Sequence, residues 1–306
     1  MKSMGMGMGL RLREKTPWYV RMAGKIVLSR IPASYHAWRA VRIFVHGGMA
    51  RPTYAYEVFR KHFDASDFPR KNSGFVALEI GPGDSLLSAV IAAAFGARQC
   101  YLVDTGNYAI TDLVPYQEIA RLLKSDGLAP PDLAGAQDLR EILRRCNATY
   151  LTGGLRSLRD LPSHAIDFAW SNAVLEHIRH HEFIAGVREL RRVLVANGCV
   201  SHQVDLKDHL GGGLNNLRFP SRWWEADWLA RSGFYTNRIR FSEMMRIFAA
   251  EGFSVATLTT GRFEALPLSR NALAREFRSL SDEDLLISDF HAVLSVSVPT
   301  ATKAAT

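Results

Sequence analysis

Residues 78–87 read LEIGPGDSLL and follow the β-prone residues Phe75-Val76-Ala77. A buried strand that runs into a turn with two glycines and then into a helix is typical of nucleotide-binding α/β proteins, because glycine lets a ligand approach the backbone closely. We expect the helix to begin at Ser85, so that its first N–H groups and the positive end of its dipole face the ligand. The stretch therefore predicts a nucleotide-type ligand beside residues 81–85.

The composition is ordinary for a globular protein with a large core. The chain has 306 residues, of which 47% are hydrophobic and 22% are charged. No apolar run approaches the roughly 18 residues of a membrane span, and the N-terminal stretch carries charges where a secretory signal would be apolar. The three cysteines, Cys100, Cys146 and Cys199, have no CxxC spacing, which favours buried thiols and a reducing compartment. We therefore expect a cytoplasmic protein.

The excess positive charge lies at one end of the chain. Residues 1–65 hold twelve Lys or Arg against three Asp or Glu, a net charge of +9 in a chain whose total is +8. Helical segments are expected after Pro17, at Tyr35–Phe44 and at Tyr54–Phe63, which gives a basic helical extension over residues 1–66. Its expected role is a cap packed on the main domain, and the alternative is peripheral contact with an anionic surface at the inner membrane face.

Residues 67–306 show an α/β pattern. Strands alternating with helices predict a doubly wound, mostly parallel sheet, seven-stranded when two late strands are included. Substrate-side insertions are expected near 105–148, with two helices, and near 206–240. The expected strands are Phe75–Ile80, Cys100–Val103, Thr149–Leu151, Ile166–Trp170, Cys199–Val204, Ser254–Thr259 and His291–Val298. The expected helices are Ser85–Phe95, Tyr116–Ser125, Asp138–Cys146, Glu182–Val195 and Phe241–Glu251.

The glycine turn has the form ExGxGxS. A dinucleotide-binding turn would place a third glycine at position 86, which is Leu86 here, and this counts against NAD. Glu79-x-Gly81-x-Gly83 resembles motif I of the class I S-adenosylmethionine (SAM)-dependent methyltransferases. The resemblance implies a Rossmann-like fold, SAM as cofactor, and contact of Glu79, Gly81, Gly83 and Asp84 with its methionine and ribose portion. Asp104 ends the second strand about twenty residues beyond the turn, where an acid can accept both ribose hydroxyls.

Later segments extend the resemblance over residues 75–205. AIDFAWSNAVLEHI (165–178) resembles the fourth strand and turn of the methyltransferase type 11 group, which implies that Ser171 and Asn172 lie beside the cofactor. Residues 189–205 resemble the next helix, turn and strand, with Asn197-Gly198 at the turn. Residues 203–219 and 233–244 are similar to bacterial methyltransferases associated with surface-glycan assembly. A small-molecule or glycan-linked acceptor, methylated on a hydroxyl oxygen, is expected because the loop is polar and Trp223, Trp224 and Tyr235 can stack on sugars.

Methylation of a hydroxyl requires a base near the ends of strands four and five. Asp205 and His209 are the preferred candidates, because they leave the fifth strand and enter a polar loop. His177 follows the cofactor turn and is a third candidate, whereas His202 is expected to be buried. The loop Gly211–Asn216 is expected to offer donors to a polyhydroxylated substrate. These donors are Asn215, Asn216 and Arg218.

Other functions are weaker interpretations. An RNA methyltransferase would bind RNA through the basic N-terminal region. An NAD-type oxidoreductase would have the same Rossmann-like fold. A noncatalytic scaffold would have the fold without a pocket competent for catalysis. DNA is disfavoured, because the fourth strand ends in SNAV rather than in the Pro-rich turn that grips a flipped base. A metal at His177, His180 and His181 is not expected, because no further ligand and no supporting shell can be identified.

Overall fold

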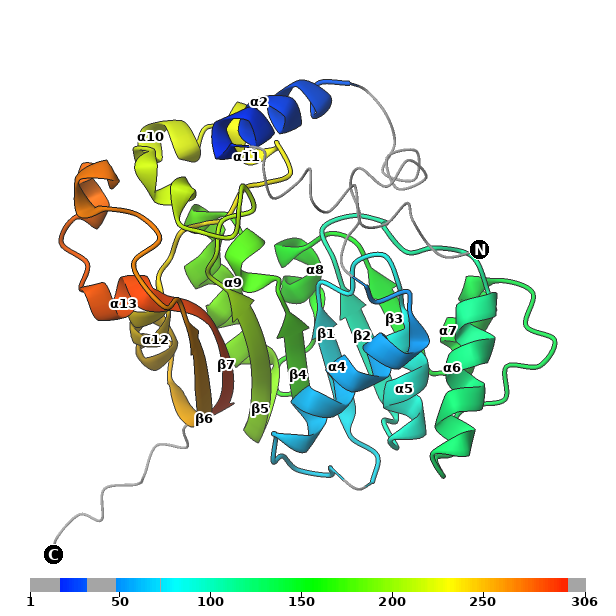
Figure 1. Ribbon diagram of the computed structural model, residues 1–306. Coiled ribbons are helices and arrows are strands. Elements are labelled where there is room, and N and C mark those ends of the chain that lie inside the picture. Colours follow the sequence, from blue (N-terminus) through cyan, green and yellow to red (C-terminus); the bar gives the residue numbers. More distant parts are fainter. Residues whose placement is uncertain (1–16, 32–47, 72, 297–306) are drawn as a thin grey trace, which may run out of the picture.

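The structure is a computed structural model that describes residues 17–31, 48–71 and 73–296 (Figure 1). Within these ranges the chain forms three layers, a central sheet with helices on both faces. The expected segment Tyr35–Phe44 lies outside the described residues. No helix of the described part has both the length and the apolar character needed to cross a bilayer.

The described residues form one seven-stranded sheet in the order β3-β2-β1-β4-β5-β7-β6. β7 runs antiparallel to both of its neighbours, and the other adjacent pairs are parallel. The doubly wound, mostly parallel fold expected from the alternating pattern is confirmed. The strands are β1 (Val76–Ile80), β2 (Gln99–Val103), β3 (Ala148–Leu151), β4 (Ile166–Asn172), β5 (Leu194–Asp205), β6 (Phe253–Arg262) and β7 (Ile287–Val296).

The strand order reverses between β1 and β4. From β1 the chain adds β2 and β3 on one side, and it then crosses back to place β4 on the other side of β1. In open α/β sheets, ligands bind outside the carboxyl ends of the strands at such a reversal, because the connections diverge there and leave a crevice. The glycine turn after β1 and the turn after β4 both lie at this edge of the sheet.

Two hydrophobic clusters fill the space between the central sheet and the helices on its two faces. The first lies under α4, α5, α6 and α7, and the second lies under α8, α9 and α12. Alternation along β1 sends Ala77 into the first cluster and Leu78 into the second. The helices are α4 (Pro52–Asp64), α5 (Leu87–Ala94), α6 (Val114–Ser125), α7 (Leu139–Arg145), α8 (Leu155–Asp160), α9 (His180–Val193), α12 (Phe241–Ala250) and α13 (Asp282–Leu286).

Helix α4 belongs to the core rather than to a separate extension. The Phe59 ring is fully buried, and its centroid lies 5.2 Å from the Trp170 ring on β4. Phe63 packs against Phe75 and Phe168 in the same cluster. Burying a phenylalanine stabilises the folded state by about 2–3 kcal/mol. The expected boundary after residue 66 therefore falls inside one packed layer.

Helix α2 (Trp18–Leu28) packs over residues 206–240, beside α10 (Ser221–Trp224) and α11 (Asp227–Ala230) (Figure 1). The shared face of Trp18, Met22 and Ile26 lies against the buried Trp224. Lys25 Nζ also donates to the carbonyl oxygen of His209 at 3.2 Å. This apolar face of α2 is covered by the protein, as expected of a packed cap.

The helix after the glycine turn begins at Leu87, not at Ser85. The Leu87 N–H contacts Ser85 Oγ at 3.3 Å, and the Leu86 N–H donates to Tyr116 Oη at 3.1 Å. The expectation that this helix presents exposed N–H groups to a ligand is therefore wrong. Its first residues are fully buried in the first cluster, and Tyr116 and Ser85 supply the acceptors that a ligand would otherwise provide.

Strand β5 begins earlier than expected and includes Asn197-Gly198. Asn197 has a φ of +60°, and the pairing of β4 with β5 shifts register just before Phe168. A residue in the left-handed region is common where an extra residue is inserted into a strand. The expected tight turn is therefore an irregularity within one long strand.

Candidate functional site

The turn after β1 requires glycine at position 81 for two reasons. Gly81 has a φ of +71°, which side-chain-bearing residues rarely adopt. A Cβ there would lie 2.5 Å from Val174 Cγ2, on the segment that follows β4. The bare backbone at Gly81 thus lets the β1 and β4 turns approach each other at the reversal of strand order.

Asp104 joins the glycine turn to the end of β2. Its Oδ2 accepts from the Gly83 N–H at 2.9 Å, and its Oδ1 accepts from the Thr105 N–H at 2.7 Å. The residue is 9% exposed, and burial raises the pKa of its carboxyl while the two N–H groups lower it. Thr105 Oγ1 also donates to Oδ1 at 3.5 Å. A carboxylate offers about four acceptor positions, so one remains on Oδ2 after these three bonds. The arrangement can accept a further hydroxyl group.

Glu79 points into the first cluster, below the turn. Its carboxyl accepts from Trp170 Nε1 at 3.2 Å and from Ser88 Oγ on α5. The side chain is buried, and desolvation raises the pKa of its carboxyl to about 7. These bonds tie β1, α5 and β4 together. Direct contact of Glu79 with a cofactor stays a prediction.

The other expected cofactor residues lie around the same turn. Ser171 is fully buried, with its Oγ 2.8 Å from His202 Nδ1, so its hydroxyl is used inside the protein. Asn172 ends β4 and is half-buried. Asp84 is buried, and its carbonyl oxygen accepts from the Ile110 N–H at 3.0 Å. Their cofactor roles stay predictions, and Asn172 is the one whose side chain lies partly in solvent.

The structure brings the three candidate bases to the ends of β4 and β5. His177 Nδ1 donates to the Tyr235 carbonyl at 2.9 Å, and the ring centroids of His177 and His209 are 4.8 Å apart. Burial lowers the pKa of His209, while the charge of Asp205 raises it. The Asp205 carboxylate lies 3.0 Å from Lys207 Nζ. His202 is buried, as expected.

The loop after β5 is organised by Asp208, which no sequence pattern singles out. Its Oδ1 accepts from three consecutive N–H groups, of which the Gly211 N–H is the nearest at 2.6 Å. Its Oδ2 accepts from the backbone N–H of Asn215 and from the side-chain Nδ2 of the same residue. Arg218 Nε in turn donates to Asn215 Oδ1 at 3.1 Å. Asn215 and Arg218 therefore hold the loop, and of the three expected donors only Asn216 lines a pocket.

The sequence matches no protein-family model and no curated protein. Solved structures with similar folds include a SAM-dependent methyltransferase from Mesorhizobium loti, with 13% identity, a TM-score of 0.45, and coverage of 80% of this chain and 99% of the other. Geranyl diphosphate C-methyltransferase from Streptomyces coelicolor has 14% identity, a TM-score of 0.43, and coverage of 80% and 79%. The [4+2]-cyclase SpnF has 15% identity, a TM-score of 0.43, and coverage of 80% and 80%.

All three identities are below 25% and all three TM-scores are below 0.5. The seven-stranded sheet, with β7 antiparallel between β5 and β6, decides the fold. The chain has the Rossmann-like fold of SAM-dependent methyltransferases. Within this methyltransferase fold, the glycine turn and Asp104 lie at the reversal of strand order, and the candidate bases lie at the ends of the neighbouring β4 and β5.

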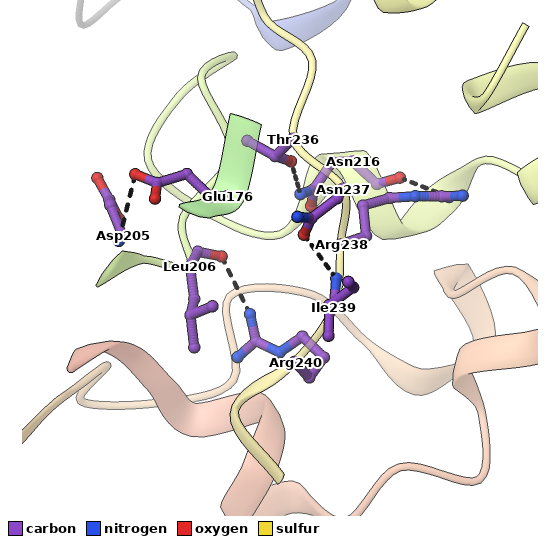
Figure 2. A pocket seen from close by; sticks show the side chains of 9 residues that line it. All are labelled: Glu176, Asp205, Leu206, Asn216, Thr236, Asn237, Arg238, Ile239 and Arg240. Atoms are coloured by element: carbon purple, nitrogen blue, oxygen red, sulfur yellow. Dashed lines mark hydrogen bonds between the residues drawn. The ribbon is translucent and has the colours of Figure 1, made fainter. Parts of the chain in front are cut away.

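A polar pocket adjoins the candidate bases in this methyltransferase fold (Figure 2). It has room for about one water molecule and is partly open to solvent. The residues around it come from the turn after β4, the end of β5, the loop after β5 and the segment 236–240. They are Glu176, Asp205, Leu206, Asn216, Thr236, Asn237, Arg238, Ile239 and Arg240.

Glu176 is one of the pocket residues that the sequence analysis missed. It lies in the 3-10 turn Leu175–His177, directly before a residue that was singled out. The side chain is 2% exposed, and burial, together with the charge of Asp205, raises the pKa of its carboxyl to about 8. The available signal was an acid in a short segment with Leu175 directly before it and Ile178 two residues after it, beyond the end of a buried strand.

Proposed function

We propose that this protein is a SAM-dependent methyltransferase that moves a methyl group to a hydroxyl oxygen of a small-molecule or glycan-linked acceptor. The observation that carries the choice of cofactor is Asp104. It is fixed by the Gly83 and Thr105 N–H groups beside the glycine turn and keeps an acceptor position on Oδ2 for a ribose hydroxyl. Because one fold hosts many reactions, this site supports the proposal and the fold alone does not.

The packing of Leu86 favours SAM over a dinucleotide. Its side chain is fully buried in the first cluster, at the position where a dinucleotide-binding turn has its third glycine. That glycine allows the helix to pack closely on the strand beside a pyrophosphate. The N–H groups of Leu86 and Leu87 already contact Tyr116 and Ser85, so the start of α5 has few donors for a pyrophosphate.

The residues present fit the cofactor and divide the work of methyl transfer. SAM supplies an electrophilic methyl group on a sulfonium, so the protein needs to bind, align and deprotonate the acceptor. Asp104 would hold the ribose, and the backbone of Gly81 and Gly83 would line the crevice. The titratable groups after β4 and β5 would face the acceptor hydroxyl.

The first prediction concerns ligand choice. Calorimetry and thermal unfolding of the wild-type chain are expected to show binding of SAM and of its demethylated product, and no binding of NAD. A ligand present at about 100 times its Kd should stabilise the folded state by about 2.7 kcal/mol. Binding of NAD without SAM would contradict the proposal. Transfer of label from methyl-labelled SAM into extracted glycans or lipids would then identify the acceptor class.

We further propose that α2, α10 and α11 contact an anionic membrane surface. Among the described residues, exposed large hydrophobic side chains gather on these elements, and Tyr19, Val27, Trp223 and Trp228 are about half exposed or more. Arg30 Nη2 donates to the Trp228 carbonyl at 3.2 Å, which joins the end of α2 to α11. Tryptophan with arginine is typical of surfaces that bind anionic lipid headgroups.

Vesicle sedimentation tests the membrane contact. The wild-type chain is expected to bind phosphatidylcholine vesicles that contain phosphatidylglycerol, and to release them as salt rises. The double variant Trp223→Ala, Trp228→Ala should bind about 10-fold more weakly, because two interfacial side chains are lost. Val255→Ala, at an exposed apolar residue on β6, is the matched control. Equal binding by both variants would contradict the contact.

A further inference from the structure

Helix α2 is apolar on the face that it turns away from the protein. Tyr19, Val20 and Val27 are 58%, 48% and 64% exposed. Ala23 and Gly24 are also exposed, and the spacing of these five residues places them on one side of the helix. A helix on the surface of a globular protein usually turns polar residues to solvent. The uncharged outer face of α2 therefore indicates contact with apolar material.

Basic residues lie beside this apolar outer face. Residues 17–31 carry Arg21, Lys25 and Arg30 and no acidic residue. An apolar face with bases beside it is complementary to the acyl boundary and the anionic headgroups of a membrane, which is the partner proposed for α2, α10 and α11. A helix of this kind lies with its apolar face about 5–10 Å deep in that boundary.

The inner side of the same helix holds the loop after β5. Arg21 Nη1 donates to the Leu210 carbonyl oxygen at 3.2 Å, and Lys25 Nζ donates to the His209 carbonyl oxygen at 3.2 Å. The Trp18 ring packs edge-on against Phe219, with ring centroids 5.9 Å apart. A helix with its side chains is about 10–12 Å thick, so the loop lies about one helix width from the lipid that the outer face would contact. That depth corresponds to the outer edge of the headgroup layer, which is about 5–8 Å thick on each side of a bilayer.

One turn connects this loop to the crevice where the methyl donor is proposed to bind. The ring centroids of His209 and His177 are 4.8 Å apart. The His177 N–H donates to the Val174 carbonyl oxygen at 2.8 Å, and Val174 is the residue that a Cβ at Gly81 would meet. The loop under α2, the turn after β4 and the glycine turn thus lie one beside the next. Figure 1 shows α2, α10 and α11 beyond the carboxyl ends of β4 and β5.

We propose that the acceptor is an amphiphile that stays in the membrane and presents a hydroxyl-bearing headgroup, under α2, to the ends of β4 and β5. This inference rests on the proposed methyl transfer and on the proposed membrane contact. The hydroxyl oxygen bonds to the methyl carbon, the carbon–sulfur bond breaks with its electron pair left on sulfur, and the hydroxyl proton passes to one of the bases after β4 and β5.

A membrane-held acceptor explains why an apolar helix covers the acceptor end of the sheet. An enzyme and an acceptor that share one surface meet at a high effective concentration, so few contacts with the headgroup are needed. A sugar free in solution has no apolar part to match the outer face of α2. The proposed class of acceptor is therefore a lipid-linked hydroxyl compound.

Label transfer by the full chain tests the class of acceptor. Cells from which the gene has been removed are separated into a membrane fraction and a soluble fraction, and each is incubated with methyl-labelled SAM and the protein. Label is expected in the membrane fraction, in a product that chloroform–methanol–water extracts. The variant Val20→Ser, Val27→Ser should transfer about 10-fold less label to the membranes, because the outer face of α2 loses apolar side chains.

The matched control is Val114→Ser, Val255→Ser, which removes two valines that are 52% and 46% exposed on α6 and β6. It should transfer label as the wild type does. Serine and valine have similar helix propensities, so α2 should stay formed in the first variant. Calorimetry should show that both variants bind the demethylated cofactor product as tightly as the wild type.

The outcomes separate this inference from the proposed function. Label in lipid that falls in the α2 variant and not in the control supports the inference. Label mainly in the soluble fraction overturns it, because the acceptor is then not held in the membrane. Equal transfer into lipid by the α2 variant and the control also overturns it. Label in neither fraction would refute the methyl transfer itself, since the two fractions together contain the acceptors of the cell.

Discussion

Asp104→Asn is expected to weaken SAM binding by on the order of 100-fold while the chain stays folded. The carboxylate offers a charged acceptor to a ribose hydroxyl, and a hydrogen bond to a charged group contributes about 1.5–3 kcal/mol. Asparagine has a similar shape and keeps one carbonyl oxygen for the Gly83 or Thr105 N–H. It replaces the other oxygen by a donor, which cannot accept from a hydroxyl. Isothermal titration calorimetry measures the loss of affinity.

Asp112→Asn is the matched control for this experiment. Asp112 is exposed, and its Oδ1 accepts from the Val114 N–H at 3.0 Å, so it is also an aspartate that caps local backbone. Equal SAM affinity of the two variants would show that Asp104 does not hold the ribose. A substitution at Gly81 is a poorer test, because any Cβ there meets Val174 and the turn itself would be strained.

The free energy of unfolding is expected to fall below about pH 6, because three buried histidines resist protonation. His62 Nδ1 and His291 Nε2 share Ser201 Oγ at 2.7 and 2.8 Å, and His202 bonds to Ser171. Burial lowers the pKa of His62 and of His202 to about 3 and that of His291 to about 4, from 6.5. The nearby charge of Lys61 acts in the same direction on His62 and His291.

The sign follows from proton counting. Between about pH 6.5 and 4 the unfolded chain binds protons on these histidines and the folded chain does not. Their stabilisation is therefore complete above pH 6.5 and is lost as pH falls, by up to about 1.4 kcal/mol per pH unit for each histidine. Glu79 and Glu176, whose pKa values are raised to about 7 and about 8, act in the opposite direction. Their stabilisation is present below pH 4.5 and is lost as pH rises through 7 and 8.

These opposing contributions place the maximum of stability near pH 6 to 6.5. Urea unfolding at several pH values measures the acid slope, and His202→Gln should reduce that slope by about 1.4 kcal/mol per pH unit. Glutamine has no titrating proton and can still hydrogen bond to Ser171. His181→Gln, on the exposed start of α9, is the control. An acid slope unchanged by His202→Gln would show that this ring is not held neutral by the fold.

The local sequence pattern was enough to predict most of the strands and helices that make up the fold. The strand expected at Phe75–Ile80 is Val76–Ile80, and the expected pair of helices in residues 105–148 is present as α6 and α7. Period and turn chemistry decide such elements within a short window of sequence. Helices α8 and α13, with six and five residues, were missed because a segment of that length carries little helical periodicity.

The candidate site was predictable only where a motif fixes the backbone. The turn at Gly81 and Gly83 has the positive φ values that favour glycine, and Asp104 reaches it because β1 and β2 are parallel neighbours. The direction of the Glu79 side chain was not predictable, because Trp170 and Ser88, which donate hydrogen bonds to its carboxyl, lie on other elements. The same holds for α5, whose start depends on Tyr116 from α6.

The sequence by itself determined the order of strands and helices, the glycine turn and the position of Asp104, because these follow from local periodicity and backbone freedom. Only the tertiary structure decided that α4 is a core helix, that α2 covers the loop after β5, and that Glu176 is buried beside Asp205. The reason is that burial and proton affinity depend on groups far apart in the chain. Asn237, in the segment after α11, holds the turn that contains Glu176, and no local sequence pattern predicts that contact.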